Sequence, residues 1–234
     1  MLRAILFDFN GVLVDDEPLH FELFRKVLAE EDIELSEEDY YREYVGYDDR
    51  ACFQAILEAH GRPAELPQMM RLITRKSMYY QQVIQEQGYP FFPGAEDLIR
   101  NCSDAGLMLG VVSGALREEV EGALRQAGLL DRFKILVPAD DVQASKPDPE
   151  GYQRGLQGLN SLPPLPDRLI HPHEVLVLED TPAGLEAASV LGMVTVGVAH
   201  TYPAEALKLA GKVVEGIEGL TCEDLRGFYG EVAG

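Results

Sequence analysis

Polar residues stand directly after short apolar runs at well separated places in the chain. Asp8 follows the first run, Ser113 the second and the Glu179-Asp180 pair the fourth, while Lys146 lies in the loop after the third. These side chains supply carboxylates, a hydroxyl and an ammonium. A hard divalent cation such as Mg²⁺ together with a phosphoryl group requires this combination of ligands and counter-charges. The residues therefore predict phosphoryl-transfer chemistry, provided that the four segments meet.

The expected roles follow from charge. Mg²⁺ would take oxygen from Asp8, from a carboxylate of the Glu179-Asp180 pair and from water. Asp8 is also the predicted nucleophile, because the metal and Lys146 would neutralise the phosphoryl oxygens that otherwise repel a carboxylate. Ser113 is expected to donate to one of those oxygens. An aspartate after a strand is by itself more often a turn or cap residue, so the prediction depends on convergence. Asp8 and Asp180 carboxylates more than about 8 Å apart would contradict it.

The elements that must position these residues are buried parallel strands. Short apolar runs at residues 2–9, 107–112, 133–137, 175–178 and 193–198 alternate with helical patterns. This alternation is typical of parallel strands joined by crossover helices. The carboxyl ends of such strands share one sheet edge, where ligands bind. The predicted fold class is therefore α/β, with a doubly wound parallel sheet.

Helical spacing replaces the strand pattern after the first run. Apolar residues recur at helical intervals over residues 21–28, over 48–60, and along a longer helix over 69–84 that Gly88 and Pro90 end. We therefore expect a catalytic core at residues 1–14 and 92–234, interrupted by an all-helical domain at residues 15–91.

Three local features outside this insertion are also predicted. Thr181 followed by Pro182 favours a helix start, with a capping side chain before proline at the first helical position. Residues 162–173 are rich in proline and favour an irregular surface loop. The Lys146-Pro147 bond is expected to be cis.

Composition excludes several classes of protein. With 46% hydrophobic residues among 234, the chain can bury a sizeable core, which excludes intrinsic disorder. The 20 basic and 40 acidic residues give a formal charge of −20, which repels nucleic acids and anionic membranes. The three cysteines include no C-x-x-C pair, so neither a disulfide framework nor a zinc site is predicted. No run approaches the length of a membrane span, and we expect a cytoplasmic monomer without nucleic-acid or membrane partners.

The ordered motifs resemble those of the haloacid dehalogenase superfamily. They are D-F-N-G-V-L-V-D from Asp8, V-V-S-G ending at Gly114, K-P-D-P-E from Lys146 and L-E-D-T-P-A-G from Leu178. The resemblance covers essentially the whole chain, and the helical insertion corresponds to the family's cap. It is most similar to the branch with β-phosphoglucomutases and phosphoglycolate-type phosphatases. A Rossmann-like core is thus implied.

The resemblance also implies site residues. Asp8 would be the phosphorylated nucleophile, and Mg²⁺ would lie between Asp8, the backbone carbonyl of Asn10, Asp180 and Glu179. Substrate would be bound by residues of the core and cap, namely Gly11, Gly114, Ala115, His20, Gly46, Arg50 and Lys76.

Two of the cap residues depart from the expected pattern. Lys76 lies on the apolar stripe of its helix, where periodicity predicts a core residue. Either it extends from a hydrophobic seam to solvent, or it points toward substrate. Arg50 is one place away from the family's substrate-phosphate arginine, and this offset counts against a bisphosphate or mutase interpretation.

Asn10 departs from the family pattern, in which a second aspartate two residues after the nucleophile serves as general acid and base. An amide cannot perform this proton transfer, which typically contributes about 10²- to 10⁴-fold to the rate. Three explanations are open: an engineered trap of an active enzyme, a natural weak or unusual phosphohydrolase, or a binding protein that has lost the chemistry. Dehalogenases of this superfamily work without a metal, so the presence of the Glu179-Asp180 pair disfavours that chemistry. Phosphonatases of the superfamily use a cap lysine to form a Schiff base, and residues 46–50 contain no lysine.

We therefore predict a Mg²⁺-dependent phosphohydrolase or phosphotransferase that acts through an aspartyl-phosphate at Asp8. Its substrate is expected to be a small phosphorylated metabolite, with a sugar phosphate as the favoured class. A hexose-phosphate mutase and a phosphate-ligand binding protein are the alternatives.

Overall fold

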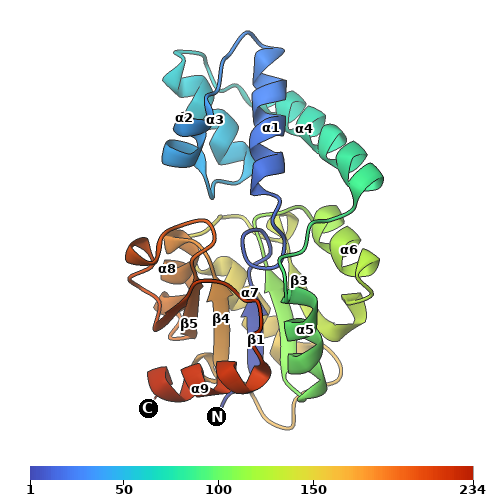
Figure 1. Ribbon diagram of the computed structural model, residues 1–234, viewed down its shortest axis with the longest axis vertical. Coiled ribbons are helices and arrows are strands. Elements are labelled where there is room, and N and C mark those ends of the chain that lie inside the picture. Colours follow the sequence, from blue (N-terminus) through green and yellow to red (C-terminus); the bar gives the residue numbers. More distant parts are fainter. Residues whose placement is uncertain (234) are drawn as a thin grey trace. The chain divides into compact units, whose positions relative to one another are not determined.

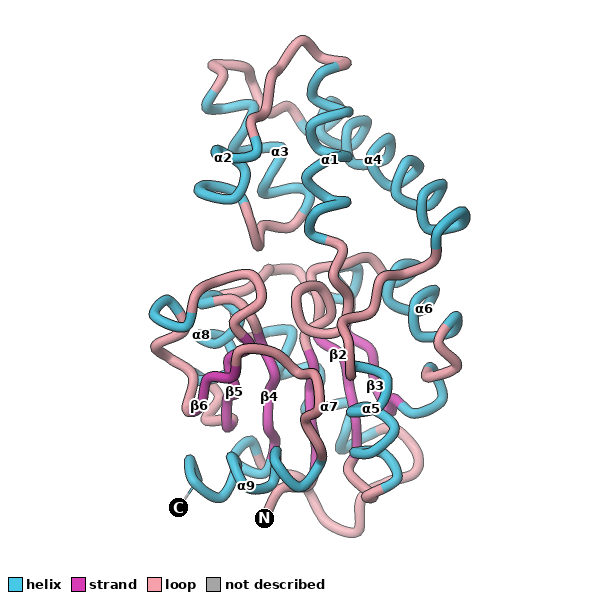
Figure 2. The backbone as a smooth tube through the Cα atoms, in the orientation of Figure 1, coloured by secondary structure: helices cyan, strands magenta, loops and turns pink. Residues whose placement is uncertain are grey.

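The computed structural model describes residues 1–233, and the chain forms two compact units. The first comprises Met1–Asp15 together with the chain from Pro90 onward, and the second is Asp16–Tyr89. Every strand belongs to the first unit, as Figure 2 shows, whereas the second is built from helices.

The first unit contains one parallel sheet (Figure 1). Its strands are β1 Ala4–Phe7, β2 Met108–Val112, β3 Phe133–Val137, β4 Val175–Glu179, β5 Val194–Val198 and β6 Lys212–Val214. They lie in the order β3-β2-β1-β4-β5-β6, and each neighbouring pair is parallel. This is the doubly wound order, with its switch point between β1 and β4. The predicted fold class is confirmed.

Burial explains which strands the sequence revealed. Every residue of β1, β4 and β5 is buried, so these strands are continuous apolar runs without alternation. The edge strand β6 was missed. It has three residues, all only partly buried, and begins with a lysine, so it leaves no apolar run.

Helices cover both faces of the sheet. They are α5 Ala95–Asp104, α6 Arg117–Gln126, α7 Glu150–Ser161, α8 Pro182–Val190 and α9 Cys222–Ala233. Helices α7 and α8 pack on each other and on the sheet, and so do α5 and α9, which lie in front of the strands in Figure 1. Short 3₁₀ turns occur at Leu130–Arg132, Ala139–Asp141, Pro172–Glu174 and Ala204–Ala206.

The local predictions for this unit are confirmed. The Thr181 hydroxyl accepts from the backbone N–H of Gly184 and caps α8, which begins at Pro182. No regular element lies between the end of α7 and the 3₁₀ turn at Pro172–Glu174. The Lys146-Pro147 bond is cis.

The second unit contains α1 Glu17–Ala29, α2 Glu37–Asp39, a π-helical turn at Tyr40–Tyr44, α3 Asp49–Ala59 and α4 Leu66–Gln87. The three longer helices are those that periodicity predicts. Their apolar faces form a shared core in which the Phe24 and Phe53 rings meet edge to face at 4.9 Å. No helix within residues 1–233 has the length and apolar character needed to cross a bilayer.

Candidate active site

The three predicted carboxylates meet at the carboxyl ends of β1 and β4. These strands are neighbours at the switch point, with Phe7 paired to Leu178, so the residues that follow them are adjacent. Asp8, Glu179 and Asp180 are buried, and each offers an oxygen within 4.8 Å of the others. The separation of Asp8 from Asp180 is thus well below the limit that would contradict a shared cation.

Lys146 joins this cluster from the loop before α7. Its Nζ donates to Asp8 Oδ1 at 2.8 Å, to Glu179 Oε2 at 2.8 Å and to the carbonyl of Val112 at 3.2 Å. One ammonium therefore bridges the first and fourth strands and also reaches the end of the second.

Glu179 has four donors. Its Oε2 accepts from Lys146 and from the Tyr152 hydroxyl at 2.6 Å, while Oε1 accepts from the Thr181 backbone N–H at 3.1 Å and the Thr181 hydroxyl at 2.7 Å. A side chain at Gly184 would overlap the Glu179 carboxyl group, so α8 approaches closely enough to enclose it. Glu179 is thereby fixed in place and holds Lys146 beside Asp8.

Asp180 has the opposite character. Its Oδ1 is buried, and no residue within 1–233 forms a hydrogen bond with it. A Cβ at Gly11, whose φ is 74°, would overlap the same carboxylate. A buried oxygen without a donor is costly but is what a cation requires, and the surrounding donors are hard oxygens of the kind that Mg²⁺ prefers. The residues present therefore fit this ion.

The pKa values show the same excess of negative charge. Burial, reinforced by Glu179, raises the pKa of Asp8 to about 6. Burial and the charges of Glu179 and Asp8 raise the pKa of Asp180 well above its usual range. Burial opposes the charge of Lys146, but Asp8 and Glu179 outweigh it and raise the lysine pKa. One ammonium does not compensate three buried carboxylates, and a divalent cation would complete the balance.

Ser113 follows β2, and its side chain is oriented by the next turn. The backbone N–H of Ala115 donates to Ser113 Oγ at 2.9 Å, which leaves the hydroxyl proton available to another acceptor. Gly114, between them, is exposed.

Asn10 and Gly11 lie in the tight loop after β1. The Gly11 N–H donates to the Val14 carbonyl at 2.9 Å, and Leu13 and Val14 donate to the carbonyl of Phe9. The loop is therefore closed by its own backbone.

The structure brings together two of the predicted cap residues. Lys76 Nζ contacts His20 Nδ1 at 2.6 Å and forms an ion pair with Asp49, and His20 Nε2 lies 3.2 Å from Asp16. Because Lys76 is only 1% exposed, the alternative in which it extends to solvent is wrong. Lys76 is therefore a buried cation of the second unit, paired with Asp49 and His20.

The two other predicted cap residues are on the surface of the second unit. Gly46 is exposed and has a φ of 81° after the π-helical turn, and Arg50 is exposed in the first turn of α3.

Several polar residues of the site were missed from the sequence. Tyr152 could not be recognised from the sequence, because it lies within helix α7 and does not follow a strand. His200 and Thr201, by contrast, follow β5 after a single alanine, and a search for polar residues after the fifth apolar run would have found them. Thr201 hydrogen-bonds the Asp180 side chain, and His200 lies 2.9 Å from the Gly11 carbonyl.

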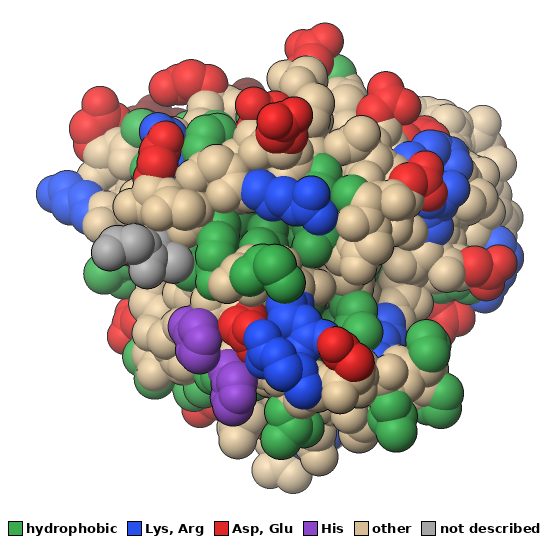
Figure 3. Space-filling view, turned by 90° about the horizontal axis from the view of Figure 1, so that it is seen from below, with side chains coloured by type: hydrophobic (Ala, Val, Ile, Leu, Met, Phe, Trp, Pro, Cys, Tyr) green, Lys and Arg blue, Asp and Glu red, His purple; other side chains and the backbone are tan. Residues whose placement is uncertain are grey.

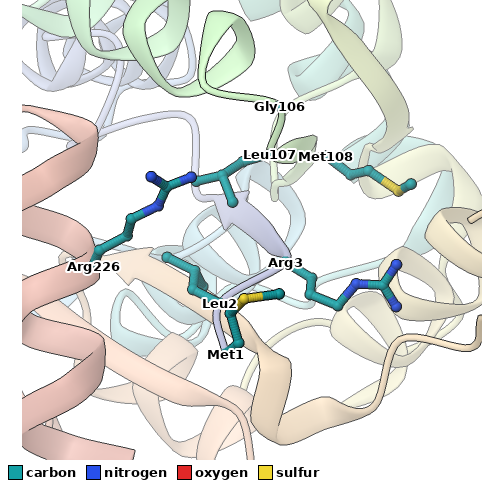
Figure 4. A pocket seen from close by; sticks show the side chains of 7 residues that line it. All are labelled: Met1, Leu2, Arg3, Gly106, Leu107, Met108 and Arg226. Carbon is teal, nitrogen blue, oxygen red and sulfur yellow. The ribbon is translucent and has the colours of Figure 1, made fainter.

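A separate cavity of about 430 Å³ lies at the start of β1 and β2 and is lined mainly by Met1, Leu2, Arg3, Leu107, Met108 and Arg226. Figure 4 shows the two arginines on different sides of it, and Figure 3 shows the surrounding face, where apolar side chains lie between basic ones. Arg3 pairs with Asp167, and Arg226 donates to the Ala105 carbonyl. None of the predicted site residues lines this cavity.

Comparison with known proteins relates the site to a family of enzymes. The chain is 30% identical over 215 residues to the phosphorylated carbohydrates phosphatase of Thermotoga maritima, covering 91% of this chain and 93% of the relative. The crystal structure of β-phosphoglucomutase from Clostridium difficile superposes with a TM-score of 0.85 at 25% identity, covering 99% and 98% of the two chains.

A third relative is CbbY from Rhodobacter sphaeroides. An aspartate-to-asparagine variant of it, solved with xylulose-1,5-bisphosphate, superposes with a TM-score of 0.79 at 26% identity, covering 94% of this chain and 96% of CbbY. A sequence model described as haloacid dehalogenase-like hydrolase matches residues 5–198. The chain belongs to the haloacid dehalogenase-like hydrolases, and its relatives include a phosphatase and a phosphomutase.

Proposed function

We propose that the protein is a Mg²⁺-dependent phosphohydrolase that acts on a small phosphorylated metabolite, in particular a sugar phosphate, through an aspartyl-phosphate at Asp8. The observation that carries this proposal is the cluster of Asp8, Glu179 and Asp180 within 4.8 Å, with Lys146 bonded to two of them. Relatives that act on phosphorylated carbohydrates support the substrate class.

Asp8, Asp180 and the backbone carbonyl of Asn10 would hold Mg²⁺. Glu179 already accepts four hydrogen bonds, so we assign it to holding Lys146 and to contacting the ion through water. When bound, the ion neutralises charge on the phosphoryl oxygens and on the carboxylates around them.

The chain's own residues would carry out two displacements. An Asp8 oxygen bonds to phosphorus as the bond from phosphorus to the sugar oxygen breaks. The sugar oxygen takes a proton from solvent water as it leaves. Water then attacks the phosphorus, its proton is lost to solvent, and inorganic phosphate and the Asp8 carboxylate are released. Lys146 and the Ser113 hydroxyl stabilise charge on the phosphoryl oxygens in both steps.

Asn10 would limit this activity. Because its amide supplies no proton to the leaving oxygen, sugar alkoxides should be poor leaving groups. The aryloxide of an aryl phosphate departs without a proton, so such a substrate should react faster. An aspartate-to-asparagine variant of CbbY has been crystallised in complex with xylulose-1,5-bisphosphate, which supports the expectation that an asparagine-containing relative can still bind a phosphorylated sugar.

A hexose-phosphate mutase is the second candidate, favoured by the structural similarity to β-phosphoglucomutase. The contacts of the second unit count against a bisphosphate intermediate, because its buried Lys76 is already paired with Asp49. We further propose that the protein is cytoplasmic and monomeric. Light scattering after gel filtration would test the oligomeric state.

The test is phosphate release from p-nitrophenyl phosphate and a panel of sugar monophosphates, with Mg²⁺ or with EDTA. We expect slow release that requires Mg²⁺ and is absent in Asp8→Asn. A mutase would convert one sugar phosphate isomer into another with little release. Thermal stabilisation by the sugar phosphates without any turnover would instead indicate a binding protein.

A further inference from the structure

The loop after β5 contacts the groups that would hold the metal. His200 Nδ1 lies 2.9 Å from the Gly11 carbonyl oxygen, and Thr201 hydrogen-bonds Asp180. A carbonyl oxygen only accepts hydrogen bonds, so Nδ1 carries the proton and donates. His200 has no part in the displacements described above.

The His200 contact fixes the direction of the Asn10 carbonyl. Gly11 is held at both of its polar groups, because its N–H donates to Val14 at 2.9 Å and its carbonyl accepts from His200. In a planar trans peptide the Asn10 oxygen points away from the Gly11 N–H. A Gly11 backbone held at both ends therefore leaves the preceding Asn10 carbonyl little freedom to turn. Gly11 itself lies against the Asp180 carboxylate, because a Cβ at this position would overlap it.

The His200 ring is itself held in place. It stacks on Phe92, with ring centroids 3.9 Å apart and an angle of 17° between the planes. The backbone N–H of Phe92 donates to the Leu13 carbonyl at 2.9 Å, so the stacking partner is anchored to the loop that His200 supports. On the other side, a Cβ at Gly216 would lie 3.0 Å from Nε2, so glycine leaves the space that the ring occupies.

We propose that His200 is a positioning residue for the metal site: its Nδ1–H holds the Gly11 carbonyl and so aims the Asn10 carbonyl toward the cation held by Asp8 and Asp180. This inference rests on the proposed function, since it supposes a divalent cation at those carboxylates. Side chains that orient metal ligands change metal affinity by about 10- to 100-fold when they are removed.

Three substitutions separate the hydrogen bond from the ring packing. His200→Phe keeps a ring on Phe92 but removes the donor. His200→Asn is the conservative variant, because its amide nitrogen can take the place of Nδ1. Phe92→Leu is the matched control, which removes the stacked ring but leaves the His200 donor.

The readout is direct metal binding, without turnover. Mn²⁺ binding is followed by the electron paramagnetic resonance signal of the free ion, Mg²⁺ binding by calorimetry, and folding by thermal melts in EDTA. We expect His200→Phe to weaken Mn²⁺ binding by about tenfold or more, and His200→Asn and Phe92→Leu to stay within about threefold of the wild type. If His200→Phe does not fold, His200→Gln replaces it, because its longer side chain displaces the donor.

The outcomes distinguish the two proposals. Wild-type protein that binds Mn²⁺ together with a His200→Phe variant that binds it equally well would overturn the role of His200 and leave the proposed function standing. Equal weakening in His200→Phe and Phe92→Leu would also overturn it, since loop packing alone would then account for the effect. Wild-type protein that binds neither ion would overturn both proposals.

Discussion

In the proposed mechanism, Asn10 is the residue that limits turnover, because its amide has no proton to give to the leaving oxygen. Replacing it with aspartate restores a titratable group two residues after the nucleophile but leaves the backbone carbonyl unchanged. We expect Asn10→Asp to raise the kcat on a sugar monophosphate at least about tenfold, since general acid catalysis contributes about 10²- to 10⁴-fold. The gain on p-nitrophenyl phosphate should be smaller, because that leaving group needs no proton.

Steady-state phosphate release measures both substrates. The double variant Asp8→Asn/Asn10→Asp is the control and should remain inactive, and intact mass checks that Asn10 has not deamidated to aspartate. An unchanged sugar-phosphate rate in Asn10→Asp would refute the argument that a missing proton donor limits turnover.

Asp8 illustrates what the site costs in stability. Its pKa is raised from 3.8 to about 6 by burial and by Glu179, so the folded protein holds this proton more tightly than the unfolded chain does. The metal-free protein therefore loses stability as pH rises from about 4 to 6, and the loss is complete above 6. Asp8→Asn should stabilise the metal-free protein by about 1–3 kcal/mol at pH 7.5 and leave it nearly unchanged at pH 4.

Thermal melts in EDTA at the two pH values test this expectation. The gain at pH 7.5 corresponds to a rise of a few degrees in Tm. A lower Tm for Asp8→Asn at pH 7.5 would mean that the contact with Lys146 outweighs the repulsion between carboxylates.

At the scale of elements, α1, α3 and α4 of the second unit are joined through a buried polar cluster. Lys76 of α4 pairs with Asp49 of α3 and contacts His20 of α1, whose other ring nitrogen faces Asp16, and the Tyr80 hydroxyl donates to Asp16 at 2.6 Å. The Lys76 ammonium also lies 4.3 Å above the Phe24 ring. The cation is held by several helices at once.

Removing either member of the ion pair should have unequal effects. Asp49→Asn leaves a buried ammonium without its carboxylate, which costs about 3–5 kcal/mol, whereas Lys76→Met replaces the charge with an apolar side chain and should cost much less. The Asp49 side chain is 28% exposed, so water can solvate it after Lys76 is removed. Urea denaturation of both variants measures the difference. In the double variant Asp49→Asn/Lys76→Met, most of the stability lost through Asp49→Asn alone should be regained, because no buried ammonium remains unpaired. Equal losses of stability in the two single variants would contradict this account.

At the scale of the whole molecule, the formal charge of −20 opposes the compact state through self-repulsion. Salt screens this repulsion, with a Debye length of about 10 Å at 0.1 M. We expect the Tm to rise as NaCl is increased from about 20 to about 200 mM, a range over which the Debye length falls through about 10 Å. Mg²⁺ at matched ionic strength should add a saturable increase.

Asp180→Asn serves as the control that separates these effects. It should keep the response to NaCl but lose the saturable response to Mg²⁺, because an amide carries no negative charge and offers a single oxygen to the proposed site. A Mg²⁺ response that is unchanged in this variant would place the ion elsewhere.

The sequence by itself determined the sheet and the identity of the main polar residues. Continuous burial makes β1, β4 and β5 legible as apolar runs, and parallel strands must deliver Asp8 and Asp180 to one edge because all their carboxyl ends lie there. The longer helices of the second unit were equally clear from their periodicity. The short edge strand β6 had no such pattern, since its residues are only partly buried.

Only the tertiary structure decided how those polar residues divide the work. Glu179 and Asp180 are neighbours in sequence with the same functional group, yet Glu179 accepts four hydrogen bonds and one oxygen of Asp180 accepts none from residues 1–233. The donors that make this difference are Lys146 before α7, Tyr152 within α7 and Thr181. The donor to the Gly11 carbonyl, His200, comes from the loop after β5. A side chain's partners depend on long-range packing, which local spacing does not encode, and for this reason Lys76 was predicted as a candidate while its pairing with Asp49 was not.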